Sequence, residues 1–324
     1  MRILLTGPCG RVGFTTLLRL LEAGHQVRCF ETRNGFITHP EGFNEAAEAY
    51  LRSKGLDYDW VWGDIRNADE VRAAVGDDVD AVIHHAAMTL PTHCEEQWEY
   101  CWEVNYYGTL HVIDAMRAAG NSPKLIYSSS VAVYGFPPEG EALDFTESDP
   151  LPATCTYAAT KIASELAIRR SGVNYTIMRM ASCADVAAPH LFLNSLPGMR
   201  ERNRIETKIK TSSSPAHFVS RDDVNTAYLN ALDNPDSDHG IFNVAGPTDC
   251  RTTFKSFRDE MSITMGGEAS RDEEWGSSPY PQGYYDTSRS DQVLQYVRTP
   301  MAGIIGNTVA ATPDIQGFLQ FYQP

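Results

Sequence analysis

The stretch TGPCGRVG, residues 6–13, places Gly7, Gly10 and Gly13 between the apolar run RILL and the segment VGFTTLLRLLEAG. The first segment has the composition of a strand, and the second has the apolar spacing of a helix. Glycines suit such a junction because the turn is tight, a pyrophosphate must approach the backbone closely, and the helix packs against its strand. The helix N-terminus, around Arg11 and Val12, then faces the phosphates with its positive end. The stretch predicts a dinucleotide-binding unit.

An acid follows at the expected distance. Glu31 stands near the end of the next apolar run, Gln26–Phe30, where a carboxylate can accept hydrogen bonds from both ribose hydroxyls. A 2′-phosphate would be repelled by this carboxylate, so the sequence favours NAD over NADP. Arg33, two residues later, can hold a 2′-phosphate if the loop folds back, which leaves NADP open.

Strand-like and helix-like segments alternate over the first 180 residues, which predicts an α/β fold with a Rossmann-type, doubly wound parallel sheet. After Met180 the alternation fails and Pro, Gly and Ser become frequent, which predicts a smaller substrate-binding lobe over 181–324, with some segments returning to the first domain, 1–180. The expected strands are Ile3–Leu5, Gln26–Phe30, Trp60–Trp62, Ala81–His84, Leu125–Tyr127 and Tyr175–Met178. The expected helices are Val12–Ala23, Phe43–Lys54, Asp69–Val75, Trp98–Ala119 and Thr156–Ser171.

The composition of the chain limits the kinds of partner that it is expected to bind. The chain has 324 residues, 42% hydrophobic content and a net charge of −15, which argues against nucleic acid or a membrane surface and for small molecules. Seven scattered cysteines favour a reduced, cytoplasmic location, and their spacing suggests neither disulfides nor a metal site. The N-terminal apolar run is too short for a signal peptide, and we expect no membrane-spanning segment.

Six motifs follow one another along the first half of the chain: TGPCGRVG, GDIRN at 63–67, VIHHAA at 82–87, VNYYGTLHVIDAMRAAG at 104–120, LIYSSSVAVYG at 125–135 and YAATK at 157–161. Together they resemble the extended short-chain dehydrogenase/reductase family, which contains nucleotide-sugar epimerases and dehydratases. The UDP-galactose 4-epimerase branch is the most similar over this half. The resemblance implies that Asp64 and Ile65 flank the adenine, that Ala86 and Ala87 pass the cofactor, and that Asn105 orders the catalytic end of the sheet.

Tyr157 and Lys161 lie four residues apart, on one face of a predicted helix. A free tyrosine titrates near pH 10, so a tyrosine base at neutral pH needs its pKa lowered by about three units. A lysine ammonium at about 4 Å supplies roughly that much. The family resemblance implies that Tyr157 exchanges the substrate proton, that Lys161 also holds the nicotinamide ribose, and that Ser130 hydrogen-bonds the substrate oxygen.

Several stretches depart from the family pattern. Val131 and Ala132 follow the serines where dehydratases carry an acid pair, which disfavours dehydration. MRMASCADV lacks the asparagine expected after the sixth strand. In SSSPAHFVSRDD the arginine expected before the HFVSRD element is replaced, and SPYPQG also lacks an arginine, so recognition of a nucleotide sugar is in doubt.

Two further features are candidates for substrate binding. The basic run Arg200, Arg202, Arg204, Lys208 and Lys210 either clamps an anionic substrate or forms a solvated face balanced by Glu201 and Glu206. Cys155, two residues before Tyr157, lies at the expected substrate mouth, where it either contacts substrate or only fills space.

These observations predict an NAD(P)-dependent oxidoreductase that transfers a hydride between nicotinamide and a secondary alcohol or ketone of a sugar-like or polyol molecule. One alternative is a nucleotide-sugar 4-epimerase with tightly bound NAD. Another is an NAD(P)-sensing regulator without turnover, although such proteins commonly lose the tyrosine and lysine. The resemblance also implies a homodimer formed through the helices at 98–119 and 156–171.

Overall fold

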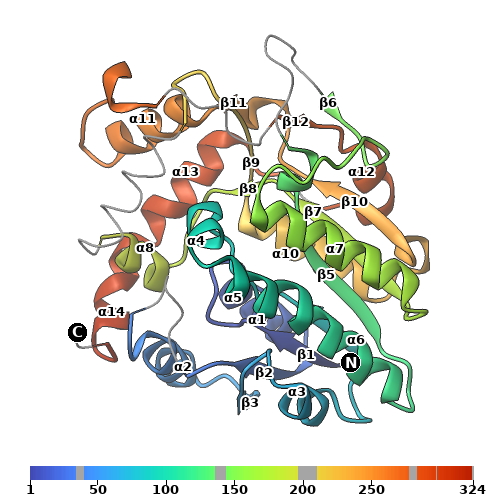
Figure 1. Cartoon of the computed structure of the whole chain (residues 1–324). Coiled ribbons are helices and arrows are strands. Elements are labelled where there is room, and N and C mark those ends of the chain that lie inside the picture. Colours follow the sequence, from blue (N-terminus) through green and yellow to red (C-terminus); the bar gives the residue numbers. More distant parts are fainter. Residues whose placement is uncertain (34–39, 136–143, 196–209, 277–282, 297, 323–324) are drawn as a thin grey trace.

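A computed structural model describes residues 1–33, 40–135, 144–195, 210–276, 283–296 and 298–322 of the chain. Seven parallel strands form its central sheet in the order β10-β7-β5-β4-β1-β2-β3 (Figure 1). This order is the doubly wound one, with the crossover between β1 and β4, and it confirms the predicted fold class. The strands are β1 (Arg2–Thr6), β2 (Gln26–Glu31), β3 (Asp59–Trp62), β4 (Ala81–His84), β5 (Lys124–Ser130), β7 (Tyr175–Met180) and β10 (Gly240–Val244).

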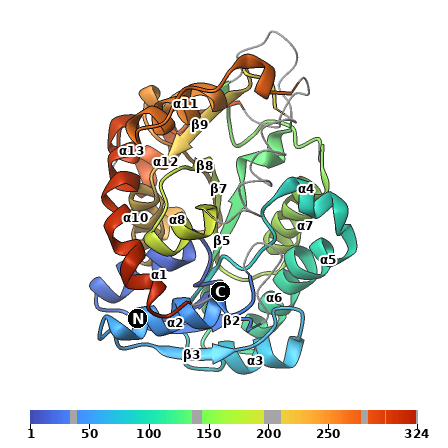
Figure 2. The ribbon, with the colours of Figure 1, turned by 90° about the vertical axis from the view of Figure 1, so that its left-hand side faces the viewer.

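Helices cover both faces of this sheet (Figure 2). On one face lie α1 (Gly13–Glu22), α2 (Phe43–Ser53) and α10 (Arg221–Leu232), and on the other lie α3 (Ala68–Val75), α6 (Gly108–Ala118) and α7 (Thr156–Arg170). Each face has its own hydrophobic core. Ile3 and Leu5 pack into the first, whereas Leu4 between them packs into the second. This alternation follows from the two-residue repeat of a strand, and it explains why β1 is apolar throughout.

The later part of the chain adds two small sheets above the carboxyl ends of the strands (Figure 1). One is β11-β9-β8 and the other is β12-β6. Between β9 and β11 in the sequence, α10 and β10 join the central layers, and β10 pairs with β7. The added elements are β6 (Asp144–Phe145), β8 (Ser182–Cys183), α8 (Ala188–Ser195), β9 (Pro215–Val219), β11 (Arg251–Thr253), α11 (Phe254–Thr264), β12 (Tyr284–Tyr285), α12 (Ser288–Leu294), α13 (Met301–Ala310) and α14 (Ile315–Leu319).

The single helix expected over 98–119 is divided in the structure. Following α4 (Pro91–Glu96), a short α5 (Trp98–Trp102) leads into a π-helical turn, Glu103–Tyr107, before α6 begins. A π turn accommodates an extra residue and often marks a functional position. Here it contains Asn105, whose side chain is 1% exposed and faces the loop after β4. No helix among the described residues combines the length and apolarity needed to cross a membrane.

Candidate active site

The glycine turn lies directly against the end of β4. Gly7 has φ +72°, and a Cβ added to it would stand 2.9 Å from the backbone nitrogen of Ala86. A Cβ on Gly13 would stand 2.1 Å from the Gly7 carbonyl oxygen, and Gly10 donates its N–H to that same oxygen at 3.1 Å. Only glycine fits such spacing, so the backbone forms a narrow cradle at the N-terminus of α1. The first turn of α1 holds no acid, which suits an anion there.

Glu31, the last residue of β2, is hydrogen-bonded to this turn. Its Oε2 accepts the N–H of Cys9 at 2.9 Å, and its Oε1 accepts the N–H of Thr32 at 2.9 Å. Burial raises the pKa of Glu31 to about 7, although these two hydrogen bonds act to lower it. Each oxygen keeps a second lone pair, so the carboxylate can also accept ribose hydroxyls.

The neighbouring basic side chains point elsewhere. The Arg33 guanidinium stands 4.7 Å from the ring centroid of Trp62, in a cation–π arrangement. Arg11 donates to Oδ1 of Asn194 at 2.6 Å, which ties the glycine turn to α8, and Val12 packs on the first hydrophobic core.

The GDIRN stretch lies after β3, at the same edge of the sheet. Asp64 receives a hydrogen bond of 2.6 Å from Arg66, which also pairs with Glu103 in the π turn. Ile65 is 7% exposed and lies against α6, where a Cβ on Gly108 would come within 2.9 Å of its side chain. The structure therefore fixes this stretch to the start of α6.

The loop after β4 is held from two sides. The Ala86 N–H donates to Oγ1 of Thr6 at 3.1 Å, which places Ala86 and the following Ala87 beside the glycine turn. Asn105 brackets Met88: its Oδ1 accepts the Met88 N–H at 2.7 Å and its Nδ2 donates to the Met88 carbonyl at 3.0 Å. Asn105 thus reaches the site through the loop that it positions.

Tyr157, Lys161 and Ser130 meet at the carboxyl end of β5. Tyr157 is the second residue of α7 and is 8% exposed, and its side chain is hydrogen-bonded to that of Ser130. Lys161, one turn later, donates from Nζ to the Ser128 carbonyl at 2.7 Å. Its Nζ stands 5.9 Å from the Tyr157 ring centroid. The structure therefore brings the three side chains together, next to the loop that contains Ala86.

The expected direction of the tyrosine pKa is wrong for the chain without a cofactor. Burial raises the pKa of Tyr157, and the hydrogen bond with Ser130 only opposes that rise. Burial also lowers the pKa of Lys161 to about 8. The tyrosine pKa is not lowered, because the Lys161 ammonium donates its hydrogen bond to a backbone carbonyl, and because the side chains of Tyr157 and Lys161 are both buried.

Two buried polar groups near the site were not anticipated. Glu165 accepts from Ser129 Oγ at 2.5 Å and pairs with Arg179 at 2.7 Å, with both ionic side chains at most 3% exposed. Ser128 joins His85 at 2.5 Å and Tyr228 at 2.8 Å. The signal for Glu165 was its position four residues after Lys161, on the same helical face.

Of the residues expected to contact substrate, the structure describes Cys155 but not the three arginines. Cys155 lies at the N-cap of α7, where its Sγ accepts the Ala158 N–H at 3.4 Å, and burial raises its thiol pKa. Cys155 is thus a protonated capping residue rather than a reactive thiolate. Arg200, Arg202 and Arg204 lie outside the described residues. Lys210, at the end of that run, has its Nζ 4.3 Å from the Phe254 ring centroid.

Curated relatives match half of the chain or somewhat more. The UDP-glucose 4-epimerase of Corynebacterium glutamicum is 30% identical over 213 residues, which are 64% of this chain and 56% of that protein. The UDP-glucose 4-epimerase of Streptomyces lividans is 32% identical over 164 residues, or 50% of this chain and 45% of that protein. The chain spans about half the length of the curated relatives it matches.

Solved structures match along the whole chain and show the fold. A Stenotrophomonas maltophila UDP-glucose-4-epimerase with bound NAD and formylated UDP-arabinopyranose has a TM-score of 0.77 at 18% identity, covering 98% of this chain and 99% of that one. The dTDP-glucose 4,6-dehydratase DesIV of Streptomyces venezuelae, with NAD bound, also has a TM-score of 0.77, at 20% identity, covering 99% of this chain and 100% of that one.

The family model for NAD dependent epimerases and dehydratases matches residues 3–245. That match contains every motif of the site, from the glycine turn through Tyr157 and Lys161, and it ends at the residue after β10. The predicted membership is thereby confirmed: the chain belongs to the NAD dependent epimerase/dehydratase family.

Proposed function

We propose that this chain is an NAD-dependent oxidoreductase that moves a hydride between nicotinamide and a secondary alcohol or ketone of a sugar-like or polyol molecule. One observation carries the proposal: the glycine cradle lies against Ala86, and Tyr157, Lys161 and Ser130 converge at the adjoining strand end. Ligands of doubly wound sheets bind at this edge, beside the crossover of the strand order.

The residues present fit the cofactor. Gly7 and Gly13 let a pyrophosphate approach the backbone, and Glu31 keeps lone pairs for two ribose hydroxyls. The Arg33 guanidinium is engaged by Trp62 instead of facing Glu31, which supports NAD rather than NADP. When bound, NAD supplies the hydride acceptor and a positive charge near the phenol.

The side chains would handle the proton. We assign Tyr157 as the general acid and base at the substrate oxygen and Ser130 as the hydrogen-bond partner of that oxygen. The pKa of Lys161, about 8, leaves it mostly protonated at neutral pH, so its charge favours the ionised phenol once the phenolic proton leaves. Lys161 is also the residue we assign to the nicotinamide ribose.

A second candidate is a nucleotide-sugar 4-epimerase, and the names of the curated relatives favour it. An epimerase returns the hydride to its substrate, so the cofactor never needs to leave. The test is to denature purified protein and quantify the released cofactor by chromatography against NAD, NADH, NADP and NADPH standards. Near-stoichiometric NAD or NADH supports the epimerase. An initially empty protein that binds NAD reversibly supports a dehydrogenase, and failure to bind any of the four contradicts both.

Cofactor affinity should depend on pH through Glu31. Its raised pKa, about 7, means that the carboxylate loses its charge as the pH falls through neutrality, and a charged acceptor binds ribose hydroxyls more strongly. We therefore expect NAD affinity to decrease by at most about tenfold in total as the pH is lowered from 8 to 6, in proportion to the ionised fraction of Glu31. Fluorescence titration of NAD at each pH measures this, and Glu31→Gln should remove the slope. An identical slope in that variant would exclude Glu31 as its source.

We propose that two copies associate through α5, the π turn and α7, which lie next to one another (Figure 2). Three large apolar side chains are exposed there: Trp98 at 56%, Tyr107 at 52% and Leu166 at 44%. Large exposed apolar side chains on elements that adjoin one another suit an interface.

A charge in this surface should separate the two copies. Leu166→Glu is expected to shift sedimentation from dimer to monomer, because burying an unpaired carboxylate in the interface is costly. Ile263→Glu on α11, at a residue 58% exposed, is the matched control and should sediment like wild type. A wild-type monomer at micromolar concentration would contradict the proposal.

We also propose a cytoplasmic location. All seven cysteines are free, and five of them are buried, as expected of a chain that folds under reducing conditions. Fractionation of the source cells with a specific antibody would test this assignment.

A further inference from the structure

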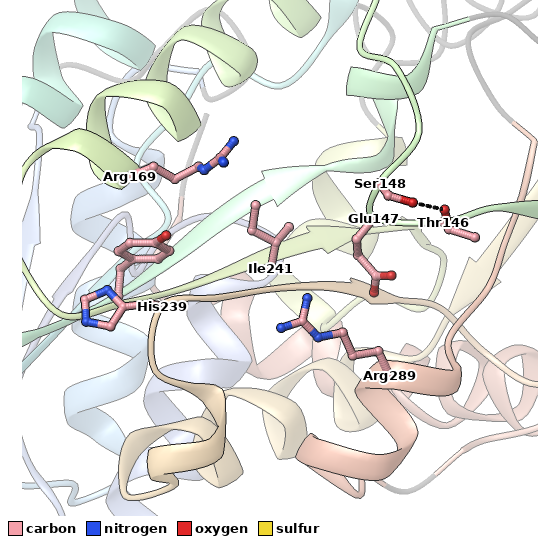
Figure 3. A pocket seen from close by; sticks show the side chains of 8 residues that line it. Thr146, Glu147, Ser148, Arg169, His239, Ile241 and Arg289 are labelled. Carbon is pink, nitrogen blue, oxygen red and sulfur yellow. Dashed lines mark hydrogen bonds between the residues drawn. The ribbon is translucent and has the colours of Figure 1, made fainter.

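A cavity of about 410 Å³ lies at the β10 side of the sheet, away from the glycine turn (Figure 3). We call it the edge cavity. Its walls come from the segment after β6, the last turn of α7, the starts of β7 and β10, and α12. Arg169 in its wall is twelve residues beyond Tyr157 on α7, which corresponds to roughly 18 Å along the helix. The edge cavity is therefore separate from the candidate active site.

Two arginines reach into the edge cavity from opposite walls. Figure 3 shows the Arg169 guanidinium extending from α7 and that of Arg289 from α12, with Ile241 between them. Neither forms an ion pair within the described part of the chain. Other arginines do: Arg28 pairs with Asp78 at 3.0 Å and Arg251 with Asp144 at 2.7 Å. The side chains of Arg169 and Arg289 are both exposed, and no described carboxylate lies within ion-pair distance of either, so each guanidinium can bind an anion that enters the cavity.

The remaining walls are preorganised and polar. His239 has φ +54°, a conformation that is costly for a residue with a side chain, and its N–H donates to the Tyr175 carbonyl at 2.7 Å. This backbone places the imidazole edge-on against the Tyr175 ring, with centroids 5.0 Å apart. Ser148 adds a hydroxyl at the rim, and the Arg289 guanidinium is also supported 4.9 Å from the Phe242 ring.

One acid, Glu147, shares the edge cavity. Its Oε1 accepts the Asn243 N–H at 2.8 Å, so β10 holds the carboxylate, which points toward Arg289 in Figure 3. Two guanidiniums against one carboxylate leave a positive balance in the cavity. A planar guanidinium binds phosphate or carboxylate oxygens through two parallel hydrogen bonds, and two of them can grip one such group.

We propose that the edge cavity is a binding site for a small oxyanion, the phosphate or carboxylate group of a metabolite, held between Arg169 and Arg289. Glu147 adds selectivity, because a ligand that also carries a hydroxyl can donate to this carboxylate, whereas a bare dianion cannot. Phosphorylated or carboxylated sugars and polyols combine both features. The site is independent of the cofactor assignment, since none of its residues belongs to the glycine turn or to the Tyr157 cluster.

The test is calorimetric titration of inorganic phosphate and of glycerol 3-phosphate into the full-length protein, with and without excess NAD. We expect saturable binding that NAD does not displace, with glycerol 3-phosphate the tighter ligand. Arg169→Gln and Arg289→Gln should each weaken it about tenfold, the effect of losing a charged hydrogen-bonding partner. The matched control is Arg170→Gln, an exposed neighbour on α7 that makes the same change in net charge outside the cavity.

The variants separate this proposal from the cofactor proposal. If the chain binds no NAD, the difference between Arg169→Gln and Arg170→Gln is still measured with phosphate alone. Equal phosphate affinity in wild type, Arg169→Gln, Arg289→Gln and Arg170→Gln would overturn the edge-cavity site, as would the absence of saturable binding to wild type. Unchanged melting temperatures of the three variants would show that any loss of affinity is local.

Discussion

Replacing Tyr157 with Phe should lower turnover by a factor of about 10² to 10⁴, the range that a positioned general acid or base contributes. The phenolic oxygen is the only atom removed, and in the structure it bonds the Ser130 side chain at the end of β5. The ring stays packed in α7, where Tyr157 is 8% exposed. We therefore expect NAD binding and melting temperature to stay close to the wild-type values.

The measurement is the rate of hydride transfer, followed by nicotinamide absorbance with a screened sugar or polyol substrate. Tyr58→Phe is the matched control, because the Tyr58 hydroxyl donates to the Glu48 carbonyl of α2 at 3.2 Å, outside the Tyr157 cluster. Its turnover should match wild type. Wild-type turnover by Tyr157→Phe would contradict the assignment. Normal NAD binding without turnover in wild type would instead favour the regulator.

The sequence predicted the sheet well for a physical reason. Parallel strands are buried on both faces, so β1, β4 and β7 are almost continuous apolar runs that stand out between helical segments. The expected strand Leu125–Tyr127 stopped before Ser128, Ser129 and Ser130, which the sequence placed only at the strand end, whereas β5 contains all three. Their hydroxyls are satisfied by partners distant in sequence, such as Glu165 and Tyr228.

Other features of the structure are not visible in the local sequence pattern. The position of β10 was not predicted, because GIFNV follows an irregular stretch and only its pairing with β7 makes it a sheet strand. The π turn at Asn105 has the same apolar pattern as a continuous α-helix. The spacing of Tyr157 and Lys161 was readable, but the direction of the tyrosine pKa depends on burial, and the Lys161 ammonium bonds the Ser128 carbonyl. The catalytic roles of these residues stay predictions.

Replacing Glu165 with Gln should destabilise the protein by about 3–5 kcal/mol, the typical cost of removing one partner from a buried ion pair. Glu165 and Arg179 are 3% and 2% exposed, and their side chains meet at 2.7 Å. Without the carboxylate, the Arg179 charge stays enclosed, with the Tyr134 hydroxyl and the Glu147 carbonyl as its remaining neutral acceptors at 3.0 and 3.1 Å. Chemical denaturation monitored by circular dichroism measures the loss.

Glu22→Gln is the matched control for that change. The Glu22 carboxylate pairs with Arg19 at 3.0 Å, and the two side chains are 62% and 43% exposed. An exposed ion pair contributes at most about 1 kcal/mol to the free energy of unfolding. If both variants lost equally little stability, the Glu165 carboxylate would not be compensating the Arg179 charge.

Loss of the Glu165 carboxylate should also affect the active site, because Glu165 holds Ser129 beside Ser130 and follows Lys161 by one helical turn. A variant that stays folded at low temperature should therefore also lose turnover, while NAD binding at the glycine turn persists.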